Sequence, residues 1–136
     1  MSDQAITGFV LAGGQASRMG TDKAALPWGK GTLVEHMRGL LSGVAAPVRI
    51  VGRNPLPDLE PGRGPLEGIR TALRTTATEN NLITAVDLPF LDRRFLDYLT
   101  TRLRATSKHL LLCRIQGYVA LCLGARRGLL KEVEDY

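Results

Sequence analysis

The chain has 136 residues, of which 44% are hydrophobic and 23% are charged, and these proportions suit one soluble domain. Its net charge of +5 is spread along the sequence and only 5% of its residues are aromatic, which disfavours a nucleic-acid-binding protein. No apolar run reaches the roughly 18 residues of a membrane span and the first residues lack a signal-peptide pattern, so we expect a cytoplasmic protein with no membrane partner.

The first elements along the chain are a strand and a helix. The continuously apolar segment 5–12 predicts a buried strand, which Gly13 and Gly14 terminate. Apolar residues at helical spacing predict a helix over 31–43, with Thr32 as its N-cap and Gly43 as its stop.

Alternating elements are predicted for the rest of the chain. The order from the first strand is β-α-β-α-β-α-β-β-α, which is typical of a three-layer α/β/α fold with a mostly parallel sheet. In such sheets ligands bind beyond the carboxyl ends of the strands. The remaining elements are strands over 47–52, 81–90, 108–114 and 118–124, helices over 66–76, 93–105 and 126–136, and a Pro- and Gly-rich loop over 54–65.

The two cysteines, Cys113 and Cys122, lie in apolar runs of the second half. They form no CxxC pair and have no histidine-rich neighbour, which disfavours a zinc site. The pattern predicts two buried free thiols.

The segment LAGGQASRMGTDKA, residues 11–24, directly follows the first predicted strand. A glycine pair lets backbone N–H groups approach a ligand closely, and Arg18 and Lys23 add positive charge at the same place. This combination favours a phosphate-binding loop over a plain surface turn. Lys23 follows Asp22 and precedes Ala24, so the segment is not a Walker A loop, and it contains no GxGxxG fingerprint.

Two further segments carry candidate chemistry. GPLEGI, residues 64–69, opens a predicted helix whose N-terminus could face an anion, but a plain loop-to-helix junction explains this segment equally well. VDLPFL, residues 86–91, places Asp87 at the end of an apolar strand. Asp87 suits either a cap of the following helix or a Mg²⁺ ligand beside substrate phosphates.

Together, in order and spacing, these segments resemble the signature of the molybdenum cofactor guanylyltransferases, which belong to the nucleotidyltransferases with a Rossmann-like fold. YVALCLGARRGLLKEVEDY, residues 118–136, is similar to a later segment of the same family, so the resemblance covers nearly the whole chain. It implies a single domain over 1–136 with a shortened second half. It also implies an enzyme that transfers GMP from GTP to the phosphate of molybdopterin or molybdenum cofactor, releases pyrophosphate and uses Mg²⁺ as its cofactor.

The resemblance also implies a role for individual residues. Arg18 and Lys23 would be catalytic and would neutralise phosphate charge, and Asp87 would hold the metal. Gly52 falls where some members carry a nucleotide-contacting Asn. The implied GTP-binding residues are Leu11, Ala12, Gly13, Gly14, Ser17, Lys23, Asp58, Gly64, Pro65 and Asp87.

Three differences from the family leave alternatives open. Only three residues separate Asn54 from Asp58, the link from Lys108 to Gly117 is short, and the chain ends at Tyr136, inside its last predicted helix. One alternative is a transferase of the same fold that uses CTP or a sugar phosphate, and another is a non-catalytic nucleotide-binding module. Homo-oligomerisation, or contact with molybdoenzyme maturation proteins, is the further partner expectation.

Overall fold

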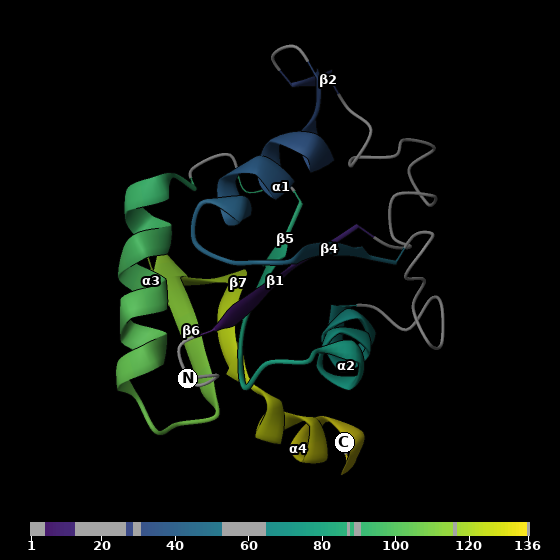
Figure 1. Cartoon of the computed structure of the whole chain (residues 1–136), viewed down its shortest axis with the longest axis vertical. Coiled ribbons are helices and arrows are strands. Elements are labelled where there is room, and N and C mark those ends of the chain that lie inside the picture. Colours follow the sequence, from purple (N-terminus) through teal and green to yellow (C-terminus); the bar gives the residue numbers. More distant parts are fainter. Residues whose placement is uncertain are drawn as a thin grey trace.

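The described residues of the computed structural model form a main sheet covered by helices on both faces (Figure 1). Its five strands lie in the order β4-β1-β5-β7-β6. This arrangement confirms the three-layer α/β/α class and the alternation of elements that the sequence predicts. The structure describes residues 5–12, 27–28, 31–52, 65–86, 88, 91–115 and 117–135.

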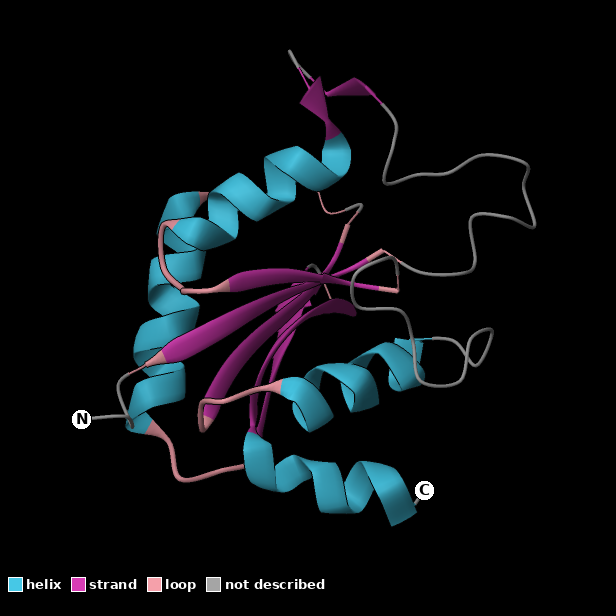
Figure 2. Cartoon of the chain, turned by 45° about the vertical axis from the view of Figure 1, so that its right-hand side comes forward, coloured by secondary structure: helices cyan, strands magenta, loops and turns pink. Residues whose placement is uncertain are grey.

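The strands and helices match most of the predicted ranges (Figure 2). The sheet strands are β1 (Ile6–Leu11), β4 (Val48–Val51), β5 (Asn80–Ala85), β6 (Leu110–Ile115) and β7 (Tyr118–Arg126). The helices are α1 (Leu33–Ser42), α2 (Pro65–Thr75), α3 (Arg93–Ala105) and α4 (Leu130–Asp135), the last preceded by the 3₁₀ turn η4 (Arg127–Leu129). None of the helices in the described ranges has the length and apolar character needed to span a bilayer.

Several elements differ from the sequence-based expectation. β7 extends to Arg126, and the last helix begins as a 3₁₀ turn at Arg127 and becomes α-helical at Leu130. The strand predicted over 81–90 ends at Ala85, the last residue that pairs with β1. The apolar run in the sequence continues beyond this residue, so it predicted a strand that is too long. A small antiparallel pair, β2 (Pro27–Trp28) and β3 (Gly31–Thr32), was not predicted. Strands of two residues are too short to show a periodic pattern.

The strand directions confirm a mostly parallel sheet. β1 pairs in parallel with β4 on one side and with β5 on the other. β7 is antiparallel to both β5 and β6, so it is the one strand of this described sheet that runs against the rest. The carboxyl ends of β1, β4 and β5 therefore lie at the same edge of the sheet, which we call the carboxyl edge.

Side-chain alternation along the strands divides the core between the two faces. On one face Val10 of β1 and Leu82 of β5 pack with α1 and α3. Helix α1 contributes Met37 and helix α3 contributes Leu96, and both side chains are fully buried. On the other face Phe9 packs with α2, and α4 covers the same cluster from outside. Complete burial of such side chains contributes about 1.5–3 kcal/mol each, so both faces stabilise the sheet.

The cysteines lie on the α1–α3 side of this core. Cys113 on β6 and Cys122 on β7 are both buried and free, as the sequence predicts. A hydrogen bond between the two thiols, together with burial, raises the pKa of the Cys122 thiol. Cys122 is therefore a protonated packing residue at neutral pH.

Helix α1 begins and ends where the sequence predicts. The Thr32 hydroxyl accepts a hydrogen bond from the Glu35 N–H, and the Glu35 carboxylate accepts one from the Thr32 N–H at 2.9 Å, which completes a capping box. Hydrogen bonds from the Thr32 backbone and side chain lower the pKa of the Glu35 carboxyl. Gly43 caps the other end and donates its N–H to the Leu40 carbonyl.

The opposite edge of the sheet holds a group of polar side chains that we call the amino-edge network, comprising Thr7, Thr76, Thr78 and Asn81. The hydroxyls of Thr7 and Thr78 lie 2.7 Å apart, and the Thr76 hydroxyl donates to Asn81 Oδ1. Asn81 Nδ2 lies 3.2 Å from the carbonyl oxygens of both Glu79 and Ala125. The network joins β1, β5 and β7 to the end of α2.

Candidate functional site

The strands β1, β4 and β5 end at the same level at the carboxyl edge. Leu11, the last residue of β1, pairs with Val51 of β4 and with Ala85 of β5, each the last residue of its own strand. The Ala12 N–H donates to the Val51 carbonyl at 2.8 Å and extends the pairing by one residue. Three chain segments therefore leave the sheet side by side, with Gly13 and Asp87 next in sequence after Ala12 and Val86.

Helix α2 places its first turn at this edge. A Cβ atom added to Gly68 would lie 3.0 Å from Leu11 Cδ2, so glycine allows the helix to approach the end of β1 closely. The other end of α2 leads into Thr76, which belongs to the amino-edge network. The helix therefore runs antiparallel to β1, and its N-terminus, the positive end of its dipole, lies beside Leu11.

The end of β4 requires an unusual backbone conformation. Gly52 has φ +94°, a left-handed conformation that glycine adopts readily and that Asn tolerates better than most residues. The family resemblance places an Asn of some members at this position. A φ of +94° strains any L side chain, so glycine fits this turn and leaves no polar side chain at this position.

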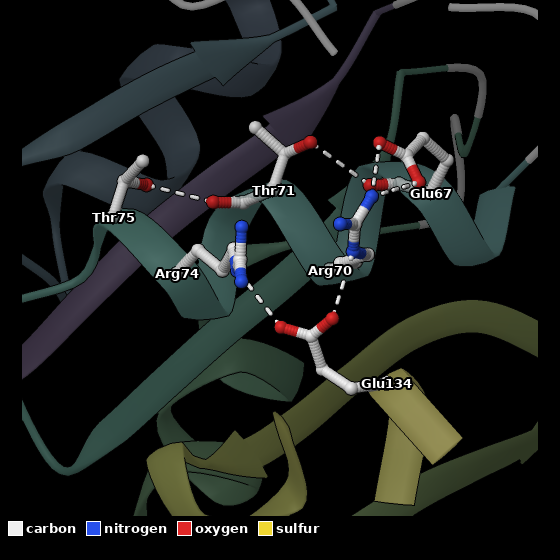
Figure 3. A network of polar contacts seen from close by, with 6 residues as sticks. All are labelled: Glu67, Arg70, Thr71, Arg74, Thr75 and Glu134. Atoms are coloured by element: carbon white, nitrogen blue, oxygen red, sulfur yellow. Dashed lines mark hydrogen bonds and ion pairs between the residues drawn. The ribbon is translucent and has the colours of Figure 1, made fainter. Parts of the chain in front are cut away.

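A chain of charged residues fixes the first turn of α2, and sequence analysis did not predict it (Figure 3). Glu67 has a side chain only 5% exposed, and it accepts hydrogen bonds from Arg70 at 3.1 and 3.3 Å. Glu134 of α4 contacts Arg70 Nε at 3.2 Å and Arg74 Nε at 2.8 Å. We call these four residues the α2–α4 ion ladder.

The ladder shifts the pKa of two of its members, Glu134 and Arg70. Partial burial alone raises the pKa of the Glu134 carboxyl, but hydrogen bonds and charges from Arg70 and Arg74 outweigh it and leave this pKa below its ordinary value. Hydrogen bonds to Glu67 and then to Glu134 raise the pKa of Arg70. Glu134 and Arg70 are therefore both charged at neutral pH. The spacing of Glu67, Arg70 and Arg74 on one helix could have predicted contacts along that helix. No pattern in the sequence indicates that the distant Glu134 joins them.

Only part of the predicted site falls within the described residues. Leu11 is half-buried and Ala12 is buried at the end of β1, and Pro65 is the first residue of α2. The structure brings Leu11 together with the first turn of α2, as a shared site requires. The predicted residues Gly13, Gly14, Ser17, Arg18, Lys23, Asp58, Gly64 and Asp87 lie outside the described residues, so their roles stay predictions.

One alternative for Asp87 loses its support. Sequence analysis left open that Asp87 caps the helix after its strand. The N-cap of α3 is Asp92, whose carboxylate accepts a hydrogen bond from the Phe95 N–H at 2.8 Å. The helix that follows β5 therefore has its own cap five positions further along the chain.

The metal ligand that the resemblance implies at this edge, Asp87, lies outside the described residues. Within the described ranges, no three His, Cys, Asp or Glu side chains lie close enough together to hold a metal. A single carboxylate from Asp87 combined with nucleotide phosphates is a donor set that suits Mg²⁺, which keeps several waters and uses one or two carboxylates. The carboxylate of Asp87 therefore fits the oxygen ligands that Mg²⁺ prefers.

Comparison with known protein families decides the classification. A family model described as the MobA-like NTP transferase domain matches residues 8–136. The chain belongs to this family. The match confirms the resemblance that the glycine-rich segment, the GPLEGI segment and the VDLPFL segment indicate.

Curated relatives carry related names. The chain is 43% identical over 97 residues to a probable molybdenum cofactor guanylyltransferase of Carboxydothermus hydrogenoformans, covering 65% of this chain and 49% of that protein. It is 37% identical over 123 residues to the molybdenum cofactor guanylyltransferase of Xanthomonas euvesicatoria, covering 86% and 63% respectively. The chain therefore spans about half to 63% of the length of these relatives.

Solved structures support the fold. The molybdopterin-guanine dinucleotide biosynthesis protein A of Archaeoglobus fulgidus superposes with a TM-score of 0.74 at 22% identity, over 95% of this chain and 71% of that one. Rv0371c of Mycobacterium tuberculosis, solved in complex with manganese, gives 0.72 at 18% identity over 97% and 76%. At these identities the likeness shows a shared fold.

Proposed function

We propose that the chain is a nucleotidyltransferase that binds Mg·GTP at the carboxyl edge and transfers GMP to the phosphate of molybdopterin. The observation that carries the proposal is the alignment of β1, β4 and β5 at Leu11, Val51 and Ala85, beside the first turn of α2. Membership of the MobA-like NTP transferase family and the names of the curated relatives support the choice of substrates.

The nucleotide would be held mainly by backbone groups. Leu11 and Ala12 would contact the base and ribose, since they end β1 at the level where parallel strands bind ligands. The small residues at Gly13 and Gly14 allow close approach of the chain to the triphosphate. Ser17, Asp58, Gly64 and Pro65 complete the proposed contacts with GTP.

The reaction requires charge neutralisation and alignment. An oxygen of the molybdopterin phosphate attacks the α-phosphorus of GTP and forms the new P–O bond. The bond between the α-phosphorus and its bridging oxygen breaks, and pyrophosphate leaves with the electron pair. The attacking phosphate is already anionic, so no general base is needed.

Charged residues would supply the remaining catalysis. Lys23 and Arg18 would stabilise negative charge that moves onto the pyrophosphate, as preorganised cations do in phosphoryl transfer. Asp87 would hold Mg²⁺, which neutralises phosphate charge and orients the triphosphate. The structural neighbour Rv0371c, solved in complex with manganese, supports the proposal of a divalent cation at this site.

A transfer assay tests the proposal. The chain is mixed with MgCl₂, molybdopterin and either GTP or CTP, and pyrophosphate release and the dinucleotide product are both measured. We expect both products with GTP and at least about tenfold lower rates with CTP, because base choice depends on a few buried hydrogen bonds. Lys23→Ala should lack activity and serves as the control for contaminating enzymes.

The outcomes separate the alternatives. Turnover with CTP in preference to GTP would replace the proposed substrate but keep the reaction class. Measurable binding of Mg·GTP without any turnover would contradict the transferase and support a nucleotide-binding module.

A further inference from the structure

We propose that Glu134 of α4 is a positioning residue for the nucleotide site, which it serves by holding the first turn of α2 against the end of β1. The inference rests on the proposed function, because it assigns the affinity for GTP partly to a residue that does not touch the nucleotide. The α2–α4 ion ladder carries the argument (Figure 3).

The first step is the two-point attachment of α2 to α4. The two carboxylate oxygens of Glu134 contact different arginines, Oε2 with Arg70 Nε at 3.2 Å and Oε1 with Arg74 Nε at 2.8 Å. Arg70 and Arg74 are four residues apart and therefore lie on one helix face in successive turns. Two anchors on one face restrict both sliding and rotation of α2, which a single ion pair would not do.

The second step carries the restraint to the first turn. The Arg70 guanidinium also donates to both carboxylate oxygens of Glu67, which is buried three residues earlier. The Glu67 carbonyl accepts the Thr71 hydroxyl at 3.0 Å, so the same residue is fixed through its backbone as well. Glu134 therefore acts on the start of α2 through Arg70.

The third step joins the first turn to the site. Gly68 directly follows Glu67 and packs against Leu11 so closely that an added Cβ would meet Leu11 Cδ2 at 3.0 Å. Movement of this turn therefore changes the space beside Leu11 and Ala12. Both residues belong to the proposed GTP contacts, as does Pro65 at the start of α2.

The ladder is separate from the apolar contacts that seat α4. Leu130 and Val133 of α4 pack against the cluster around Phe9 and Ile69. This apolar packing remains when the Glu134 charge is removed. Glu134→Gln should therefore fold, and its effect should appear in the position and mobility of α2.

The test compares Glu134→Gln with Glu132→Gln in the full 136-residue chain. Glu132 lies on the same helix with its side chain 64% exposed, and its carboxylate lies 3.8 Å from His109 Nδ1, away from α2. We expect Glu134→Gln to raise the Kd for Mg·GTP by about 3- to 10-fold and Glu132→Gln to change it by less than about twofold.

Kinetics distinguish positioning from catalysis. Glu134→Gln should raise the KM for GTP and leave kcat within about twofold, because Glu134 contacts no reacting atom. High salt should reduce the difference between wild type and Glu134→Gln, since the ion pairs are partly exposed. A Kd equal to that of wild type in a folded Glu134→Gln variant would overturn the inference.

Hydrogen exchange in the absence of nucleotide gives a readout that does not depend on the proposed function. The N–H groups of residues 69–72 close the first turns of α2, and they should exchange several-fold faster in Glu134→Gln. Exchange in α1 and α3 should not change. Faster exchange combined with no GTP binding by wild type would refute the function alone, whereas unchanged exchange would refute the positioning role.

Discussion

The two edges of the same sheet are built from different chemistry. At the amino edge, Thr7, Thr76, Thr78 and Asn81 bond with one another and with backbone carbonyls, so their hydrogen-bonding capacity is used within the protein. At the carboxyl edge, β1, β4 and β5 end in Leu11, Val51 and Ala85, whose side chains carry no polar groups. In the sequence, a glycine or a charged residue follows within two positions of each strand end, at Gly13, Gly52 and Asp87.

This difference suggests a division of labour. Buried polar groups that satisfy one another fix strand register and stabilise the fold. Residues that bind a ligand instead pair their charged groups with the ligand, and they contribute little to the stability of the fold. Substitutions at the amino edge should therefore lower the free energy of unfolding and leave GTP affinity unchanged. Substitutions at the carboxyl edge should lower GTP affinity and leave the free energy of unfolding unchanged.

The largest expected effect is that of Lys23→Ala on catalysis. Removal of one preorganised charge that stabilises the transition state should reduce the transfer rate by on the order of 10²–10³-fold and should also weaken Mg·GTP binding. Denaturant unfolding should give the same free energy as wild type. Unchanged affinity and rate in a folded variant would remove Lys23 from the site.

Asp87→Asn should have the next largest effect. As a metal ligand, Asp87 should matter for Mg²⁺-dependent transfer far more than for nucleotide binding measured in EDTA, because Asn lacks the charge that binds the cation. Titrating activity against Mg²⁺ concentration measures the change. A near-normal Mg²⁺ dependence would remove Asp87 from the metal site.

Asn81→Leu tests the other edge. The side chain of Asn81 is completely buried, and its removal leaves the Thr76 hydroxyl and the Glu79 and Ala125 carbonyls without this partner. Unsatisfied buried groups cost about 1–3 kcal/mol each, so the free energy of unfolding should fall by about 2–4 kcal/mol. The Kd for Mg·GTP, measured well below the unfolding midpoint, should stay at the wild-type value.

The smallest expected effect is a pH dependence confined to the α2–α4 ion ladder. The pKa of Glu134 is lowered from 4.5 in the folded protein, so its contribution is present above that value and is lost as pH falls through the folded pKa. The stability difference between wild type and Glu134→Gln should therefore be constant near neutral pH and disappear in acid.

The amino edge provides the matched comparison for this pH series. Thr and Asn side chains do not titrate in this range. The stability difference between wild type and Asn81→Leu should therefore persist at the acidic values where the Glu134 difference disappears. Parallel loss of both differences would show that acid affects the whole fold and not the ladder.

Local signals in the sequence predicted much of the fold. Apolar periodicity placed α1 and α3, and Thr32 and Gly43 marked the ends of α1, because caps are local features. The β2–β3 pair escaped detection because its strands have two residues each. The end of β5 depends on pairing with β1, which the apolar run through Phe90 did not reveal.

The candidate site was less accessible to such reasoning. Glycine and charge patterns pointed to the ends of β1 and β5, and the resemblance supplied the individual roles. The contact of Glu134 with Arg70 joins residues 64 positions apart, and the approach of Gly68 to Leu11 depends on how α2 packs. Contacts of this kind follow from tertiary structure and leave no pattern in the local sequence.

The central claim is that a nucleoside triphosphate binds at the carboxyl edge, and an NMR titration of the ¹⁵N-labelled chain with Mg·GTP tests it most directly. We predict saturable shifts of the backbone amides of residues 10–12, 52 and 66–69, with no shifts at Thr7 or at residues 76–81. Lys23→Ala should require more GTP for the same shifts, and Asn81→Leu should not. Shifts concentrated at the amino edge, or no saturable shift at millimolar GTP, would contradict the account.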